Sequence, residues 1–85
     1  MLKFDYLIQD ENGIHARPAG LLVKEASKYN SEINIEHKDK MANAKKIFSL
    51  MSLGIKKNDL ITITVNGTDE ATAFEALKIF MHQNL

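Results

Sequence analysis

The chain has 85 residues, no cysteine, and eleven basic against eleven acidic side chains. This length suits one domain, and the lack of cysteine excludes disulfides, thiolate catalysis and cysteine-based zinc sites. The balanced charge gives no global field to recruit nucleic acid, and no apolar run approaches the roughly 20 residues that a membrane span needs. From the length we expect one domain over residues 1–85. No secretory signal is visible, so we expect a cytoplasmic location.

The first predicted element is a half-buried strand at the N-terminus, in which apolar and polar residues alternate. Its apolar face holds Leu2, Phe4, Tyr6 and Ile8. A turn over residues 10–13 leads into a helix that begins near Ala16 and ends near Tyr29-Asn30. Apolar residues at spacings of three and four form its buried stripe: Ala19, Leu22, Val23, Ala26 and Tyr29.

Residues 31–37 alternate again, and a polar turn over 38–40 leads to a short strand through Met41 and Ala42. These two strands should form a hairpin. Residues 47–53 are predicted to form a short helix closed by Gly54. Residues 60–65 form the fourth predicted strand, with Ile and Val alternating with Thr.

The last predicted element is a helix that follows a turn at Asn66-Gly67. Thr68 is its predicted N-cap, and Asp69 and Glu70 would complement the helix dipole in the first turn. Its predicted buried face comprises Ala73, Phe74, Leu77, Phe80 and Met81.

The predicted order is therefore βαββαβα, which indicates a two-layer α+β sandwich. Three helices would cover one face of a four-stranded antiparallel sheet. The first six elements also match the split βαβ pattern, so the order alone equally allows a ferredoxin-like domain.

A candidate anion site lies in the segment Gly13 to Ala19, where His15 and Arg17 stand at the start of the first predicted helix. Gly13 permits a sharp turn, and Pro18 suits a first helical turn. A phosphate here would meet unpaired backbone amides, the positive end of the helix dipole and the Arg17 guanidinium. A lone histidine before a helix is often only a capping or surface group. In this setting an imidazole could instead accept a phosphoryl group as a nucleophile.

With these residues in view, the chain resembles HPr, the histidine-containing phosphocarrier family of the phosphoenolpyruvate-dependent sugar phosphotransferase system. The resemblance covers essentially the whole length. Besides the histidine segment, it includes Ala26-Ser27-Lys28-Tyr29 and Met51-Ser52-Leu53-Gly54-Ile55. It implies the HPr open-faced β-sandwich.

The resemblance also implies a function. His15 would accept a phosphoryl group from phospho-enzyme I, through its δ1 nitrogen in family members, and pass it to the A domains of sugar permeases. Arg17 and the backbone amides of Ala16 and Arg17 would stabilise charge on the transferring group. The protein would thus be a carrier rather than an independent enzyme, a monomer, and free of cofactors.

The short second helix carries more apolar residues than one buried stripe can use, so some must face outward. Leu21, in the first helix, also lies off the core stripe. Such residues can be scattered surface apolarity, but the resemblance implies a docking surface for enzyme I and the permease A domains. The matching positions are Gly20, Leu21, Lys24, Ile47, Phe48 and Met51, and Arg17, Lys24, Lys45 and Lys46 would suit acidic partners.

One departure from the family concerns regulation. Many members carry a serine at the start of the second helix that an ATP-dependent kinase phosphorylates in low-GC Gram-positive bacteria. Lys46 occupies the matching position here. A lysine cannot accept that phosphate ester, and neither Ser49 nor Ser52 is well placed to replace it. We therefore expect phosphoryl carriage without seryl regulation.

The other two histidines, His37 and His82, are expected to be structural or solvated, and their spacing predicts no metal site. Two rival functions stay open. One is a paralogous regulator, of a nitrogen-related or accessory branch, that acts on non-transport targets. The other is a binding module in which His15 is only a structural cap.

Overall fold

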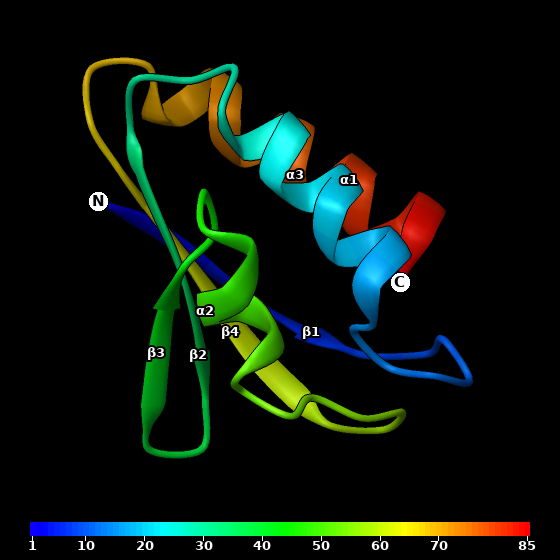
Figure 1. The fold of residues 1–85 in the computed structure, drawn as a ribbon. Coiled ribbons are helices and arrows are strands. Elements are labelled where there is room, and N and C mark those ends of the chain that lie inside the picture. Colours follow the sequence, from blue (N-terminus) through cyan, green and yellow to red (C-terminus); the bar gives the residue numbers. More distant parts are fainter.

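The computed structural model describes all residues, 1–85, and contains four strands and three helices in the predicted order βαββαβα (Figure 1). In chain order they are β1 (Leu2–Leu7), α1 (Ala16–Ala26), β2 (Glu32–His37), β3 (Lys40–Asn43), α2 (Ile47–Met51), β4 (Leu60–Asn66) and α3 (Glu70–Asn84).

The strands form one sheet in the order β1-β4-β2-β3, and every neighbouring pair is antiparallel. β1 pairs with β4 from Leu2↔Val65 to Leu7↔Leu60. β2 and β3 form the predicted hairpin. The four-stranded antiparallel sheet is therefore confirmed, and its register places the alternating apolar residues of neighbouring strands on the same face.

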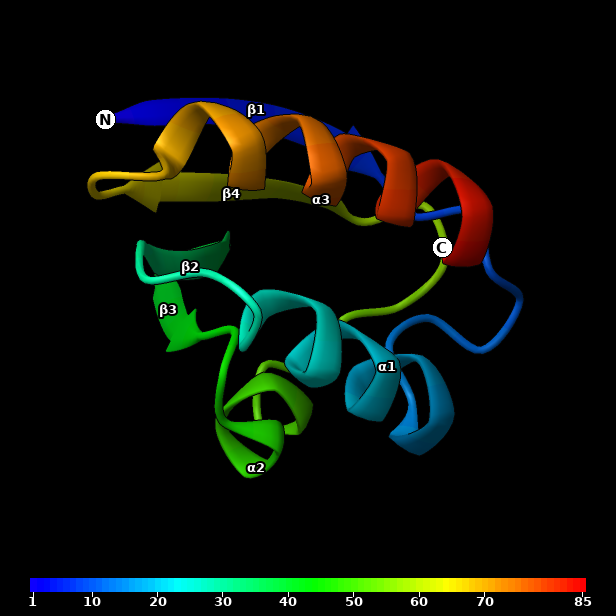
Figure 2. The same cartoon turned by 90° about the horizontal axis from the view of Figure 1, so that it is seen from above.

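The three helices lie on one face of this sheet (Figures 1 and 2). α3 runs along β1 and β4, and α1 lies between α3 and α2. One hydrophobic cluster of 21 buried residues fills the space between the layers, and it includes Ile8, Leu22, Ile35, Leu50, Ile63 and Leu77. No helix in the chain is both long enough and apolar enough to cross a membrane.

Both shorter helices end earlier than predicted. α1 ends at Ala26, and the amides of Lys28 and Tyr29 then bond to carbonyls only three residues back. α2 ends at Met51 and is likewise followed by a tight turn. Such i→i+3 turns satisfy the last carbonyls of a helix without extending it. Gly54 closes this segment as predicted, with a φ of +63°.

The prediction of Thr68 as the N-cap of the last helix is wrong, because Asp69 occupies that position. The Asp69 side chain does not cap α3. Its carboxylate accepts hydrogen bonds from the amides of Asn30 and Ser31, at 2.8 and 3.0 Å, and from the Ser31 hydroxyl. These bonds tie the segment after α1 to the start of α3, a tertiary role that capping statistics cannot predict.

Candidate functional site

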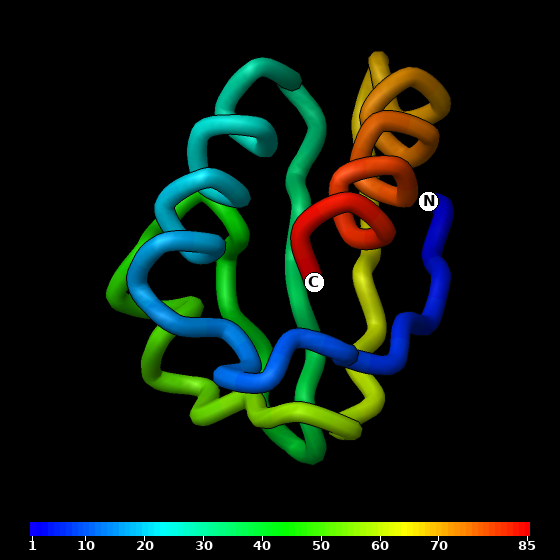
Figure 3. The backbone as a smooth tube through the Cα atoms, turned by 90° about the vertical axis from the view of Figure 1, so that its right-hand side faces the viewer, coloured from blue at the N-terminus to red at the C-terminus, as the bar shows by residue number.

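The segment between β1 and α1 is held at both of its ends. The amides of Gln9 and Asp10 donate to the Leu85 carbonyl at 2.7 and 3.0 Å, and the Ile14 amide donates to the Ile55 carbonyl at 3.1 Å. Figure 3 shows the end of α3 beside this segment. The position of the following helix start is therefore set by contacts from two distant parts of the chain.

Gly13 is required in this segment for two reasons. Its φ of +64° is a left-handed conformation that residues with a side chain rarely adopt. A Cβ atom at this position would also collide with the backbone at Ile55 and Lys56. Gly13 therefore allows the close approach that anchors the residues just before α1.

His15 is the N-cap residue of α1 and has an extended backbone, with a φ of −111° and a ψ of −176°. Its carbonyl accepts the bond from Ala19, but its ring makes no capping hydrogen bond. The imidazole is half-exposed, and its Nε2 lies 3.7 Å from Oδ1 of Asp10. The ring is thus available for chemistry.

The first turn of α1 leaves backbone donors free beside this ring. The amides of Ala16 and Arg17 have no hydrogen-bond partner in the protein, and Pro18 has no N–H to offer. The exposed Arg17 guanidinium makes no ion pair. A small pocket joins these groups, and it is lined by Asp10, His15, Arg17, Pro18, Leu21 and Asn84. Free amides, a helix N-terminus and a guanidinium together suit a phosphate-sized anion.

The predicted partner surface consists of neighbouring residues of α1 and α2. Gly20 faces Ile47, since a Cβ on Gly20 would lie 3.8 Å from Cδ1 of Ile47. Phe48 is 87% exposed, and Leu21 and Met51 are 42% and 40% exposed. These three large apolar side chains and Lys24 are exposed on two helices that contact each other, and Leu21 also lines the pocket.

Lys45 and Lys46, which were predicted to suit acidic partners, differ in whether the side chain is free to contact a partner. Lys45 is half-buried, and its Nζ donates to the Tyr29 carbonyl at 2.7 Å. Lys46 is exposed and is the N-cap residue of α2. Of the nearby serines, Ser49 lies inside α2, and Ser52 donates its hydroxyl hydrogen to the Ser49 carbonyl at 2.7 Å.

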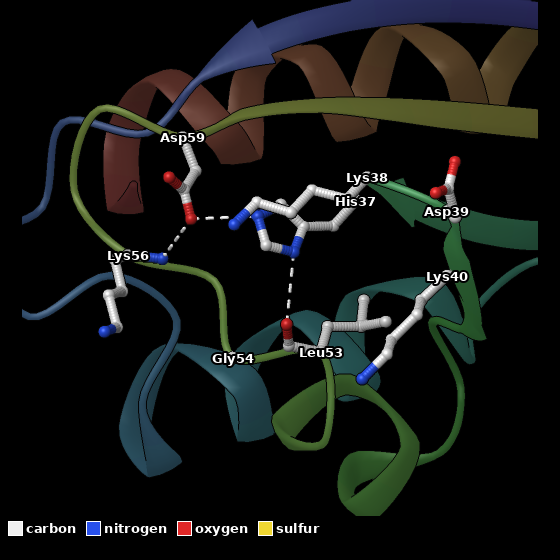
Figure 4. A pocket seen from close by; sticks show the side chains of 8 residues that line it. All are labelled: His37, Lys38, Asp39, Lys40, Leu53, Gly54, Lys56 and Asp59. Atoms are coloured by element: carbon white, nitrogen blue, oxygen red, sulfur yellow. Dashed lines mark hydrogen bonds and ion pairs between the residues drawn. The ribbon is translucent and has the colours of Figure 1, made fainter.

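The remaining histidines lie away from this pocket. His37 is buried at the end of β2, and Figure 4 shows its ring between two oxygen atoms. Nδ1 lies 3.1 Å from the Leu53 carbonyl, and Nε2 lies 2.9 Å from Oδ2 of Asp59. His82 is exposed and packs edge to face against Tyr6.

The His37–Asp59 contact is a feature that the sequence did not reveal, since the two residues are 22 positions apart. Asp59 also accepts a hydrogen bond from the Lys56 amide at 2.9 Å. That backbone bond first, and then the contact with His37, lower the pKa of the Asp59 carboxyl below its ordinary value. This cluster joins the end of β2 to the loop before β4, so of the two expectations for His37, structural or solvated, its burial favours the first.

The fold and this site together define a class: small α+β sandwiches that present a histidine and free amides at a helix N-terminus, where a phosphoryl group can be held. Comparison with known proteins names the family. The family model described as the PTS HPr component phosphorylation site matches residues 2–83. The chain belongs to the HPr phosphocarrier family of the phosphotransferase system.

Similar proteins support this assignment over nearly the whole chain. The phosphocarrier protein HPr of Buchnera aphidicola subsp. Baizongia pistaciae is 52% identical over 81 residues, which are 95% of each chain. A solved structure of a mycoplasma histidine-containing phosphocarrier protein has a TM-score of 0.94 and 43% identity, covering 96% of this chain and 93% of its own. The match selects the HPr sandwich over the ferredoxin-like alternative.

A third similar protein bears on assembly. It is an HPr from Thermoanaerobacter tengcongensis solved as a dimer, with a TM-score of 0.77 and 38% identity, covering 92% of this chain and 90% of its own. Family membership therefore does not decide whether this chain is a monomer.

Proposed function

We propose that this chain carries phosphoryl groups on His15, accepting them from phospho-enzyme I and passing them to the A domains of sugar permeases. The observation that supports this most is the half-exposed His15 ring beside the unpaired amides of Ala16 and Arg17 and the free guanidinium of Arg17. Membership of the HPr phosphocarrier family supports phosphoryl transfer as the chemistry of this arrangement.

The proposed step is attack by Nδ1 of His15 on the phosphorus of the donor's phosphohistidine. Negative charge on the transferring group is stabilised by the two amides, by the dipole of α1 and by Arg17. The helix N-terminus holds these donors in place before the group arrives. Orientation of donor and acceptor comes from docking of the larger partner, so the chain acts as a carrier rather than as an independent catalyst.

We further propose that the surface formed by α1 and α2 binds both partners. It comprises Gly20, Leu21, Lys24, Ile47, Phe48 and Met51. Leu21 lines the pocket, Phe48 and Met51 are exposed on the neighbouring helix, and the exposed Lys24 favours acidic partner surfaces. Because both partners use one surface, each complex must dissociate before the next forms, which favours weak and fast binding.

The test is incubation with phosphoenolpyruvate, Mg²⁺ and purified enzyme I, followed by intact mass and acid-lability measurements. The wild type should gain one acid-labile phosphate, and His15→Ala should gain none while keeping its fold. Arg17→Gln should gain phosphate roughly 10- to 100-fold more slowly, because it loses a bidentate charged donor at an exposed site. A folded wild type that takes no phosphate would favour the binding-module function.

A further inference from the structure

The pocket beside His15 contains one acidic side chain, Asp10, and its carboxylate faces the imidazole. Oδ1 of Asp10 lies 3.7 Å from Nε2 of His15, which is the only ion-pair contact that the ring makes. The distance is longer than a hydrogen bond. Contacts of this kind in unliganded sites often shorten when the reacting complex forms.

Asp10 is held in place by three hydrogen bonds. Its amide donates to the Leu85 carbonyl at 3.0 Å, and its carbonyl accepts from the Gly13 amide at 3.0 Å. Its Oδ1 accepts from the Asn12 amide at 2.8 Å. The side chain is 28% exposed. Both its backbone and its side chain are therefore fixed, unlike those of a mobile surface acid, and the turn directs the carboxylate at His15.

A carboxylate beside one ring nitrogen selects the tautomer of a neutral histidine. Neutral imidazole carries a single N–H, and an acceptor at Nε2 favours the tautomer with the proton on that nitrogen. The lone pair then lies on Nδ1, at the other edge of the ring. This is the nitrogen that the proposed transfer requires.

We propose that Asp10 is a positioning residue for phosphoryl transfer, which holds His15 in the Nε2–H tautomer and balances positive charge on the phosphorylated ring. This inference rests on the proposed function, since it takes His15 as the acceptor. Asp10 acts through His15 and does not touch the phosphoryl group.

The step is balanced without any proton transfer. The Nδ1 lone pair forms the new bond to phosphorus, while the bond from phosphorus to the donor's imidazole nitrogen breaks and its electron pair returns to that nitrogen. Nε2 keeps its proton throughout, and the ring of His15 gains positive charge as Nδ1 becomes bonded to phosphorus. The nearby Asp10 carboxylate stabilises that charge.

The test compares Asp10→Asn with a matched control, Glu11→Gln. Asparagine keeps a side-chain oxygen that can accept from the Asn12 amide, so the turn survives. The same oxygen still faces Nε2 of His15, but it lacks the negative charge that makes the carboxylate the stronger acceptor, so the variant tests that charge. Glu11 is the next residue, and its carboxylate bonds to Lys57 at 2.7 Å instead of facing His15. Each variant removes one negative charge from the same segment.

Two measurements separate this role from a merely structural one. The ¹⁵N shifts of neutral His15 in the unphosphorylated protein report the tautomer directly. We expect Asp10→Asn to move the ratio part of the way toward Nδ1–H, because a neutral amide oxygen is a weaker acceptor than a carboxylate, and Glu11→Gln to leave the ratio unchanged. The kcat for phosphorylation by enzyme I should fall roughly 5- to 20-fold in Asp10→Asn, less than for a buried pair, with KM little changed.

An unchanged tautomer ratio in Asp10→Asn would overturn the proposal, and so would a shifted ratio with an unchanged kcat. The tautomer measurement needs no enzyme I. A wild type that accepts no phosphate yet shows Asp10-dependent tautomer selection would therefore refute the proposed function while leaving the pairing intact.

Discussion

At the scale of single residues, Lys46 is the position where this chain departs from its family. The residue is exposed and occupies the N-cap position of α2 without a side-chain capping bond, and the resemblance to the family implies a phosphorylatable serine at this position in many members. The two serines nearby are worse placed. Ser49 is inside the helix, and Ser52 is at its C-terminal end, where an added phosphate would meet the negative end of the dipole.

We predict that an HPr kinase with ATP adds no acid-stable phosphate to the wild type. Lys46→Ser restores the missing hydroxyl and should gain one acid-stable phosphate, which makes it a positive control for the assay. Intact mass after acid treatment distinguishes this ester from phosphohistidine. Stoichiometric acid-stable phosphate on the wild type would contradict the loss of this regulation.

The sequence predicted some of the residues that line the pocket, but not the contacts that hold the others in place. His15, Ala16 and Arg17 are adjacent in the chain, so a helix start was enough to bring them together. Asp10 and Asn84 line the same pocket from separate segments. The position of Asp10 depends on the long-range bond from its amide to the Leu85 carbonyl, which no local pattern encodes. The side chain of Asn84 bonds only to the Phe80 carbonyl one turn back in α3, so it reaches the pocket through the packing of the end of that helix.

At the scale of elements, the start of α1 depends on the backbone conformation at Gly13. We predict that Gly13→Ala lowers the free energy of unfolding by roughly 2 to 4 kcal/mol, because it adds a left-handed strain and a collision with Ile55. Gly20→Ala is the control. Its new Cβ would only reach ordinary contact with Ile47, so it should be neutral or stabilise α1 by up to about 1 kcal/mol.

Urea unfolding of the two variants measures this difference. Equal stabilities would show that the turn before α1 can relax without cost. That result would contradict the inference that Gly13 fixes the position of the start of α1.

α2 is the element whose exposed face offers the clearest test of docking. Phe48 is 87% exposed and therefore contributes little to the core. We predict that Phe48→Ala changes the free energy of unfolding by no more than about 0.5 kcal/mol but weakens binding to enzyme I by about tenfold or more. Calorimetric titration measures the affinity.

The control is Ile79→Ala on α3, where the side chain is 56% exposed and lies outside the proposed surface. It should leave the affinity unchanged. If both variants lose affinity equally, or neither loses any, the docking surface has been assigned to the wrong elements.

At the scale of the whole molecule, two half-buried carboxylates make contacts that join distant segments. Asp59 joins the loop before β4 to β2, and Asp69 joins α3 to the segment after α1. Hydrogen bonds to the charged carboxylates lower the pKa of both below their ordinary value of 3.8, mainly from the Lys56 amide at Asp59 and the Ser31 hydroxyl at Asp69. A carboxyl whose pKa is lower in the folded than in the unfolded state stabilises the folded state at pH values above its unfolded-state pKa. This contribution disappears as the pH falls through the folded-state pKa.

We therefore predict that Asp59→Asn unfolds more easily than the wild type at neutral pH, and that the difference shrinks as the pH falls below 3.8. Thermal unfolding at a series of pH values measures it. Asp39→Asn is the control, since this exposed carboxyl lines the pocket that also contains His37 and Asp59 (Figure 4) and makes no hydrogen bond. A stability difference that is independent of pH would contradict a role for the charged Asp59 carboxylate.

The order of elements and their buried faces followed from the sequence, because alternation and helical spacing report which side of each element is apolar. The strand order β1-β4-β2-β3 did not, apart from the β2–β3 hairpin. Alternation says which face of a strand is buried but not which strand lies next to it. The ends of α1 and α2 also differed from prediction, because each helix closes in a tight turn. The N-cap of α3 differed because Asp69 occupies that position, and its side chain bonds to Asn30 and Ser31 instead of to its own helix.

Assembly is a further property of the whole molecule. We keep the prediction of a monomer, although one similar HPr was solved as a dimer. One surface that serves two partners in turn works most simply when no second copy covers it.

We propose that His15 both receives and delivers a phosphoryl group, and a chase experiment tests this two-way transfer most directly. Phosphorylated protein is separated from enzyme I, mixed with a purified A domain of a sugar permease, and followed by intact mass. We predict that phosphate leaves this chain and appears on the A domain in equal amount. Phosphate that remains on His15, or is lost only to water, would contradict a role in sugar transport and favour the paralogous regulator.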